Sequence, residues 1–167
     1  MRLCERRFSI ALATLLTAAG PLSAQTLGSP APAITLKTLA GETASLSDYK
    51  GRPVFLNFWA SWCKPCRGEM SDIIAAYDAH KDQHLQVLAI NLTDQERMTD
   101  ARKFADESHM PFPVLLDQRG KVRKSYALRG VPTSVFIDVH GIVRLINPGP
   151  ITSEAIQRGL EEILPAR

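Results

Sequence analysis

The sequence predicts a single α/β domain with a central mixed β-sheet flanked by helices. Two near-continuous apolar runs, 54–60 and 85–92, are typical of strands buried on both faces of a parallel sheet. Each run is followed by a segment with helical features, and two strands joined by a tight turn come late in the chain. Parallel strands with crossover helices in the first part of the chain, followed by an antiparallel hairpin, indicate a mixed sheet. The length of 167 residues suits one domain with its own hydrophobic core.

The first 24 residues have the features of an export signal. Three arginines precede an apolar stretch over 8–19, and a small-residue cleavage site ends at Ala24. The apolar stretch is shorter than the roughly 20 residues of a transmembrane helix. We therefore expect a signal peptide over 1–24, with an uncleaved anchor as the alternative. Residues 25–33 follow as an extended segment, and 34–167 form the folded domain.

The charge balance argues against a nucleic-acid partner. Loss of residues 1–24 removes three arginines and one glutamate, so 20 basic and 17 acidic residues become 17 and 16, a net charge of +1. No basic stripe with interleaved aromatic residues remains.

The first half of the domain is predicted to hold a hairpin, a strand and a helix. Alternating residues over 34–39 and 43–46 predict the hairpin, and the strand at 54–60 follows a Gly-Arg-Pro loop. Apolar residues recur with helical spacing up to His80, which predicts a helix that begins near Cys63.

The second half is predicted to alternate strands and helices before it ends in a hairpin and a helix. The expected elements are a strand at 85–92, a helix at 94–108 capped by Thr93 or Asp94, a strand at 114–117, a short helix at 122–128, strands at 134–138 and 142–146, and an amphipathic helix at 153–164. The caps and the closing Gly130 and Pro165 are typical helix boundary signals.

Two cysteines three positions apart remain after the signal, Cys63 and Cys66. A bridge between them closes a very small loop, so it constrains the unfolded chain little and is a poor structural staple. Zinc needs about two further ligands, and the four histidines are scattered without a zinc-finger spacing. Arg67 follows the second cysteine, which excludes a c-type haem attachment motif.

A C-x-x-C between a buried strand and a helix is the arrangement of a redox pair. Unpaired N–H groups and the helix dipole at the helix start favour an anion, which lowers the pKa of the first thiol. We expect Cys63 to be the exposed nucleophile and Cys66 the shielded resolving thiol. Pro65 fits because it falls in the first helical turn, where its missing N–H costs nothing.

The segment Trp62-Cys63-Lys64-Pro65-Cys66, together with the strand pattern and Gly130-Val131-Pro132-Thr133, resembles the thioredoxin fold. More narrowly, the chain is similar to exported ResA/TlpA-like thiol-disulfide oxidoreductases in its signal, its "LKTLAGETASLSDYKGRPVFLNFWASWC" run, its "CRGEM" sequence and the segment before "FPVLLD". The resemblance implies a thioredoxin-like domain over 34–167 with an N-terminal β-hairpin and an inserted βα segment.

The resemblance also implies a docking surface for substrate. Pro132 would have a cis peptide bond and lie beside Cys63, with the Val131 backbone free to pair with an extended substrate strand. Trp62 would flank the site, whereas Trp59, within the apolar run, is expected in the core.

An acid–base role is implied for Glu69, three residues after Cys66. Thioredoxin has a buried aspartate where this chain has Asn57, and an amide cannot take a proton. Glu69 matches the glutamate of ResA-like proteins and would assist deprotonation of Cys66, with a pKa raised by burial. The alternative is an ordinary first-turn glutamate that interacts with the helix dipole. Lys64 and Pro65, between the cysteines, would modulate the pair.

The resemblance implies a periplasmic reductase of protein disulfides that needs no cofactor beyond the Cys63–Cys66 pair and no metal. Apocytochrome c before haem attachment and copper-site proteins are the implied substrates, and a membrane electron conduit would recharge the dithiol. We expect a monomer. A thiol oxidant or isomerase of the same fold is one alternative, and a non-catalytic binding module or metallochaperone is another.

Overall fold

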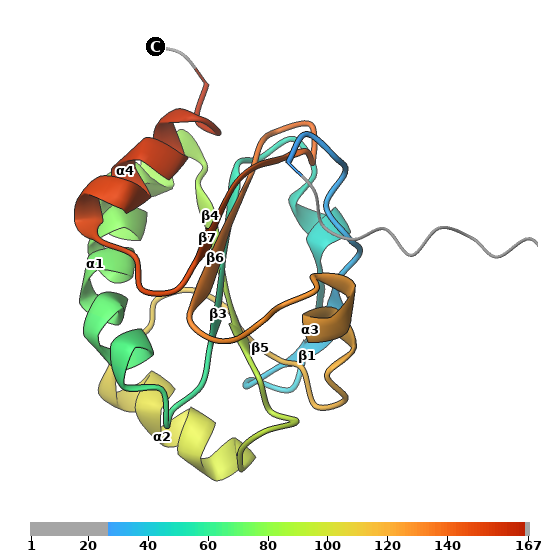
Figure 1. Ribbon diagram of the computed structural model, residues 1–167, viewed down its shortest axis with the longest axis vertical. Helices are drawn as coiled ribbons and strands as arrows, with labels where there is room; N and C mark the ends of the chain where they lie inside the picture. The colour runs from blue at the N-terminus through green and yellow to red at the C-terminus, as the bar shows by residue number, and fades with distance from the viewer. Residues whose placement is uncertain (1–26, 166–167) are drawn as a thin grey trace, which may run out of the picture.

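A seven-stranded mixed β-sheet runs through the protein (Figure 1). The computed structural model describes residues 27–165, so the predicted signal peptide at 1–24 lies outside the described residues. The strands are β1 (Thr35–Thr38), β2 (Thr43–Ser45), β3 (Val54–Trp59), β4 (Gln86–Asn91), β5 (Val114–Leu116), β6 (Thr133–Ile137) and β7 (Val143–Pro148). Their order across the sheet is β2-β1-β5-β4-β3-β6-β7.

The pairing directions confirm the mixed sheet and both predicted hairpins. β3, β4 and β5 are parallel to one another, whereas β1/β2 and β6/β7 form antiparallel hairpins at the two edges. β3 lies between β4 and β6, and all six of its residues are buried. Parallel strands end at the same edge of a sheet, and the Leu92 N–H donates to the Trp59 carbonyl at 3.0 Å. The segments that follow β3 and β4 therefore lie next to each other.

Helices cover both faces of the sheet (Figure 1). The first face carries α1 (Lys64–His80), α2 (Met98–Glu107) and α4 (Ser153–Glu161), and the opposite face carries α3 (Lys121–Ser125) and a 3₁₀ turn at Leu46–Tyr49. A second 3₁₀ turn, Lys81–Gln83, follows α1. Under α1 and α4, the rings of Phe55 and Phe136 stack with centroids 4.4 Å apart.

The start of α2 differs from the prediction. The helix was expected from Asp94 with a cap at Thr93 or Asp94, but it begins at Met98 after Arg97, which makes no side-chain cap. The Thr93 hydroxyl donates instead to the Asn91 side chain at 2.8 Å. Residues 93–97 thus form a turn at the end of β4 rather than a helical turn.

Two later helices end earlier than expected. α3 ends at Ser125 rather than at residue 128, because Ala127 has a φ of 47°, in the left-handed region. α4 ends at Glu161 rather than at 164, a difference within the usual fraying of helix ends.

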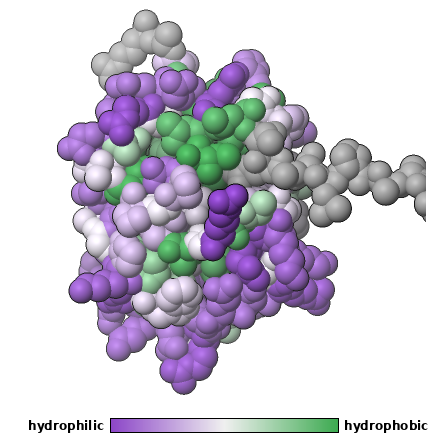
Figure 2. Space-filling view, in the orientation of Figure 1, coloured by the Kyte–Doolittle hydropathy of each residue, from purple (hydrophilic) through white to green (hydrophobic). Residues whose placement is uncertain are grey.

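The surface in Figure 2 is mostly hydrophilic, with hydrophobic side chains gathered near the middle of the face shown. None of the helices within residues 27–165 is long and apolar enough to cross a bilayer.

Candidate active site

The two cysteines lie at the junction of β3 and α1. A turn over Ala60–Cys63 follows β3 and is closed by the Cys63 N–H, which donates to the Ala60 carbonyl at 3.2 Å. Cys63 is the N-cap of α1, with Pro65 in the first turn as expected. Cys63 and Cys66 form a disulfide with their Cα atoms 5.3 Å apart. The Cys66 N–H donates to Cys63 Sγ at 3.2 Å, so a backbone dipole points at that sulfur.

The expected exposure of Cys63 is wrong for this disulfide form. Cys63 is only 4% exposed and Cys66 is fully buried. Both belong to the hydrophobic cluster beneath α1, and the Cys63 sulfur is bonded to Cys66. Cys63 is still slightly more exposed than Cys66, which is the expected order of exposure.

Glu69 is buried on α1, one turn beyond Cys66, and is only 4% exposed. Its Oε1 accepts from Asn57 Nδ2 at 2.9 Å, and its Oε2 accepts from the Ile151 N–H at 3.1 Å. Burial raises the pKa of this carboxyl, the two hydrogen bonds lower it by less, and nearby Asp72 adds to the rise. The structure thus joins Asn57 and Glu69, two residues singled out separately in the sequence.

The loop before β6 contains Val131 and Pro132, the residues expected to bind substrate. The Val131–Pro132 peptide bond is cis. Val131 is half-buried and packs against the hydrophobic cluster that contains both cysteines. Within residues 27–165 the Val131 backbone makes no hydrogen bond, whereas the Pro132 carbonyl accepts from the Gly149 N–H at 2.9 Å.

The two tryptophans have different positions. Trp59 is fully buried and meets the Phe104 ring edge-on, with centroids 5.2 Å apart, which confirms its place in the core. Trp62 is 58% exposed beside Cys63. Lys64 is exposed next to the same cysteine.

An open groove of about 570 Å³ adjoins Trp62. It lies between the turn after β3 and helix α2, and its lining includes Ser61, Arg67, Glu96 and Phe104. None of these four residues was predicted from the sequence to be a site residue. Glu96 was hidden within a segment predicted as helix, and the one available signal was its place in a polar run just after a buried parallel strand, where α/β sheets bind ligands.

Within the described residues, no group of three or more His, Cys, Asp or Glu side chains has the arrangement of a metal site.

A disulfide-forming C-x-x-C at the start of a helix, shortly after the buried strand β3 of this sheet, defines a thioredoxin-fold thiol-disulfide oxidoreductase. The chain belongs to the AhpC/TSA family, whose sequence model matches residues 27–146.

Relatives of the chain are named as thiol-disulfide oxidoreductases or as thioredoxin-like proteins. The thiol-disulfide oxidoreductase ResA of Geobacillus kaustophilus is 39% identical over 143 residues, which cover 86% of this chain and 81% of that protein. The thioredoxin-like protein YneN of Bacillus subtilis is 39% identical over 135 residues, 80% of this chain and 78% of that protein. A crystal structure from Chlorobium tepidum, described as a thiol:disulfide interchange protein DsbE, superposes with a TM-score of 0.77 at 34% identity, over 83% of this chain and 97% of that one.

Proposed function

We propose that this oxidoreductase works as an exported reductase of protein disulfides. Cys63 attacks the substrate, Cys66 resolves the mixed disulfide, and Glu69 takes the proton of Cys66. The buried Glu69 carboxyl, held by Asn57 one turn from Cys66, is the observation that carries this assignment. A buried carboxyl with a raised pKa can accept and release a proton closer to neutral pH than an exposed one.

The reaction consists of two exchanges. The Cys63 thiolate attacks one sulfur of a substrate disulfide, which forms a mixed disulfide and releases the first substrate thiolate. Cys66 then transfers its proton to Glu69 and attacks the Cys63 sulfur, which releases the second substrate thiolate and forms the Cys63–Cys66 disulfide. The substrate gains two electrons and the enzyme dithiol loses two. The released thiolates take up protons from Glu69 and solvent.

Substrate would dock beside the cysteines on Trp62 and the Val131–Pro132 segment. The exposed Trp62 offers an apolar surface, and the unpaired Val131 backbone offers one N–H and one C=O to an extended chain. Main-chain pairing of this kind tolerates many sequences, which suits a reductase of protein disulfides.

The signal features at 1–24 support a periplasmic location. A reductant in that compartment needs a membrane electron conduit to reduce the Cys63–Cys66 disulfide after each turnover. The resemblance of the chain to ResA/TlpA-like proteins supports apocytochrome c or copper-site proteins as substrates, with roles in cytochrome c maturation or copper-site assembly.

A trapping experiment tests the assigned roles. Cys66→Ser removes the resolving thiol, so the variant expressed in its native host should accumulate mixed disulfides through Cys63. Mass spectrometry of the trapped species would name the substrate proteins. Cys63→Ser is the matched control and should trap none; equal trapping by both variants would refute Cys63 as the attacking residue.

A further inference from the structure

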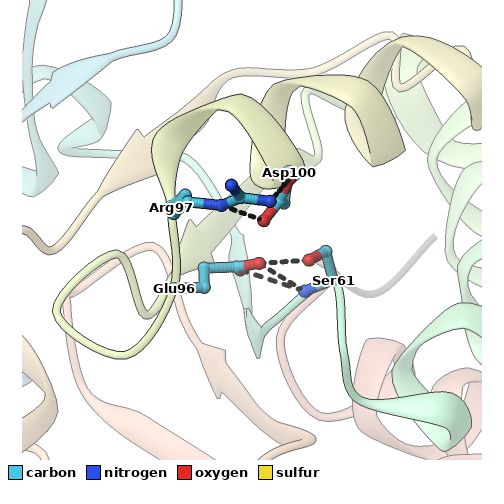
Figure 3. Close-up of polar contacts among 4 residues, drawn as sticks. All are labelled: Ser61, Glu96, Arg97 and Asp100. Carbon is cyan, nitrogen blue, oxygen red and sulfur yellow. Dashed lines mark hydrogen bonds and ion pairs between the residues drawn. The ribbon is translucent and has the colours of Figure 1, made fainter.

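The turn that leads to Cys63 is held by a carboxylate from a distant part of the chain. Glu96, in the turn between β4 and α2, accepts from the Ser61 N–H at 3.0 Å and 3.2 Å with its two oxygens, and it also accepts from the Ser61 hydroxyl. The Asn91 side chain donates to the same carboxylate. Figure 3 shows the Glu96 side chain directed at Ser61.

Ser61 lies within the tight turn that presents the redox pair. This turn runs from Ala60 to Cys63 and carries the exposed Trp62. Two residues span at most about 7 Å, so the Glu96 carboxylate lies within roughly 10 Å of the Cys63 backbone. That separation is comparable to the Debye length of about 10 Å at 0.1 M salt.

The negative charge of Glu96 has no ion-pair partner in the described part of the chain. Its neighbour Arg97 binds Asp100 instead, at 2.9 Å and 3.2 Å (Figure 3). Across the groove, Arg67 pairs with Glu107 at 3.6 Å and lies over the Phe104 ring.

Three elements that pack around the redox pair carry other charged groups: α1, α2 and the loop before β6. Lys64 is exposed on α1 next to Cys63, and Glu69 is buried behind the cysteine pair. Lys103 on α2 pairs with Glu107 at 3.8 Å. Arg129 is exposed on the loop before Pro132. Lys64 thus places a positive charge next to Cys63, whereas Glu96 places a negative charge on the turn that precedes it.

We propose that Glu96 is a positioning residue for the redox pair: its carboxylate holds the Ala60–Cys63 turn, and its charge opposes ionisation of the Cys63 thiol. A less stable thiolate makes the dithiol less stable relative to the disulfide, so Glu96 biases the pair toward donating electrons. This role rests on the proposed function, in which Cys63 is the attacking thiol.

The test measures the pKa of the Cys63 thiol from the pH dependence of its alkylation by iodoacetamide. All variants are made in a Cys66→Ser background, so that Cys63 is the thiol read whichever cysteine attacks substrate. Glu96→Gln and Glu96→Ala should each lower the pKa of Cys63 by roughly half a unit to one unit at low salt, and by less at high salt. Both variants remove the charge, so the pKa of Cys63 can still be measured in one of them if the other fails to fold.

Two further variants separate charge from structure. Glu96→Asp keeps the charge, but its shorter side chain should weaken the hydrogen bonds to Ser61. It should leave the pKa of Cys63 within about 0.2 units of the parent. Glu42→Gln, in the exposed hairpin turn between β1 and β2 at the far edge of the sheet, is the matched control and should change nothing. An unchanged pKa in Glu96→Gln, or an equal shift in Glu96→Asp, would overturn the proposal. Failure of Cys63 to trap substrate would instead overturn the proposed function alone.

Discussion

At the residue scale, the candidate site contains a buried carboxyl, Glu69, beside a buried amide, Asn57. Asn57 donates to Glu69 through Nδ2, and its Oδ1 has no hydrogen-bond partner within residues 27–165. An aspartate at position 57 would place a second carboxylate against Glu69, and like charges at such a distance oppose each other's ionisation. The neutral amide therefore leaves Glu69 as the one proton acceptor in this pair.

Glu69→Gln should slow resolution of the mixed disulfide by about 10²-fold, the lower end of typical general-base contributions. Glu69 acts as a base only when ionised, so in the parent the resolution rate should rise as pH increases through its raised pKa. The variant should lose that inflection. Stopped-flow kinetics across pH, with a preformed mixed disulfide, measures both effects.

Asp72→Asn provides the matched comparison for Glu69. Because the charge of Asp72 helps to raise the pKa of Glu69, its removal should move the inflection to lower pH without reducing the maximal rate. Identical profiles in Glu69→Gln and the parent would show that Glu69 is an ordinary first-turn residue.

At the element scale, α4 is fitted closely to the sheet beneath the redox helix. A Cβ atom at Gly159 would lie 2.5 Å from the Phe136 ring, which is itself stacked on Phe55. Ile151, just before α4, donates its N–H to Glu69. The placement of α4 therefore affects both the core and the buried carboxyl.

Gly159→Ala should destabilise the protein by about 1–3 kcal/mol, because the methyl group forces the Phe136 ring or the helix to move. Gly68→Ala is the matched control on α1, where a Cβ meets nothing within 4 Å. Alanine is the better helix former by roughly 0.5–1 kcal/mol, so this control should be stabilised slightly. Urea unfolding of both variants measures the difference, and equal stability of the two would contradict the close fit.

At the scale of the whole molecule, the direction of electron flow is a difference in stability between two redox forms. A reductant is a protein whose disulfide form is stabilised by folding more than its dithiol form. Each 30 mV of potential below that of the unfolded pair corresponds to about 1.4 kcal/mol of extra stability in the disulfide form.

We therefore expect the disulfide form to resist urea unfolding better than the dithiol form, by at least about 1.4 kcal/mol. Equilibration with glutathione measures the potential directly on the same protein. A more stable dithiol form, with a potential near the value of about −120 mV found for a strong oxidant, would identify a thiol oxidant instead.

Local patterns in the sequence determined the elements and the redox pair. Apolar runs and helical periodicity depend on neighbouring residues, so the strands, both hairpins and the start of α1 near Cys63 were predicted within a few residues. The spacing of Cys63 and Cys66 is likewise local, since one helical turn brings the two sulfurs within bonding reach.

The tertiary structure decided which distant groups meet around that pair. Glu96 reaches Ser61 across 35 residues, and Ile151 reaches Glu69 across 82. These contacts exist only because β3 and β4 end at one edge of the sheet and α4 returns beside α1. Thr93 shows that even a short-range contact can escape local patterns. Its hydroxyl could have capped a helix, but in the structure it donates to the Asn91 side chain. Hydrogen bonds between distant side chains follow from the order of strands and the layers of helices, which no local spacing encodes.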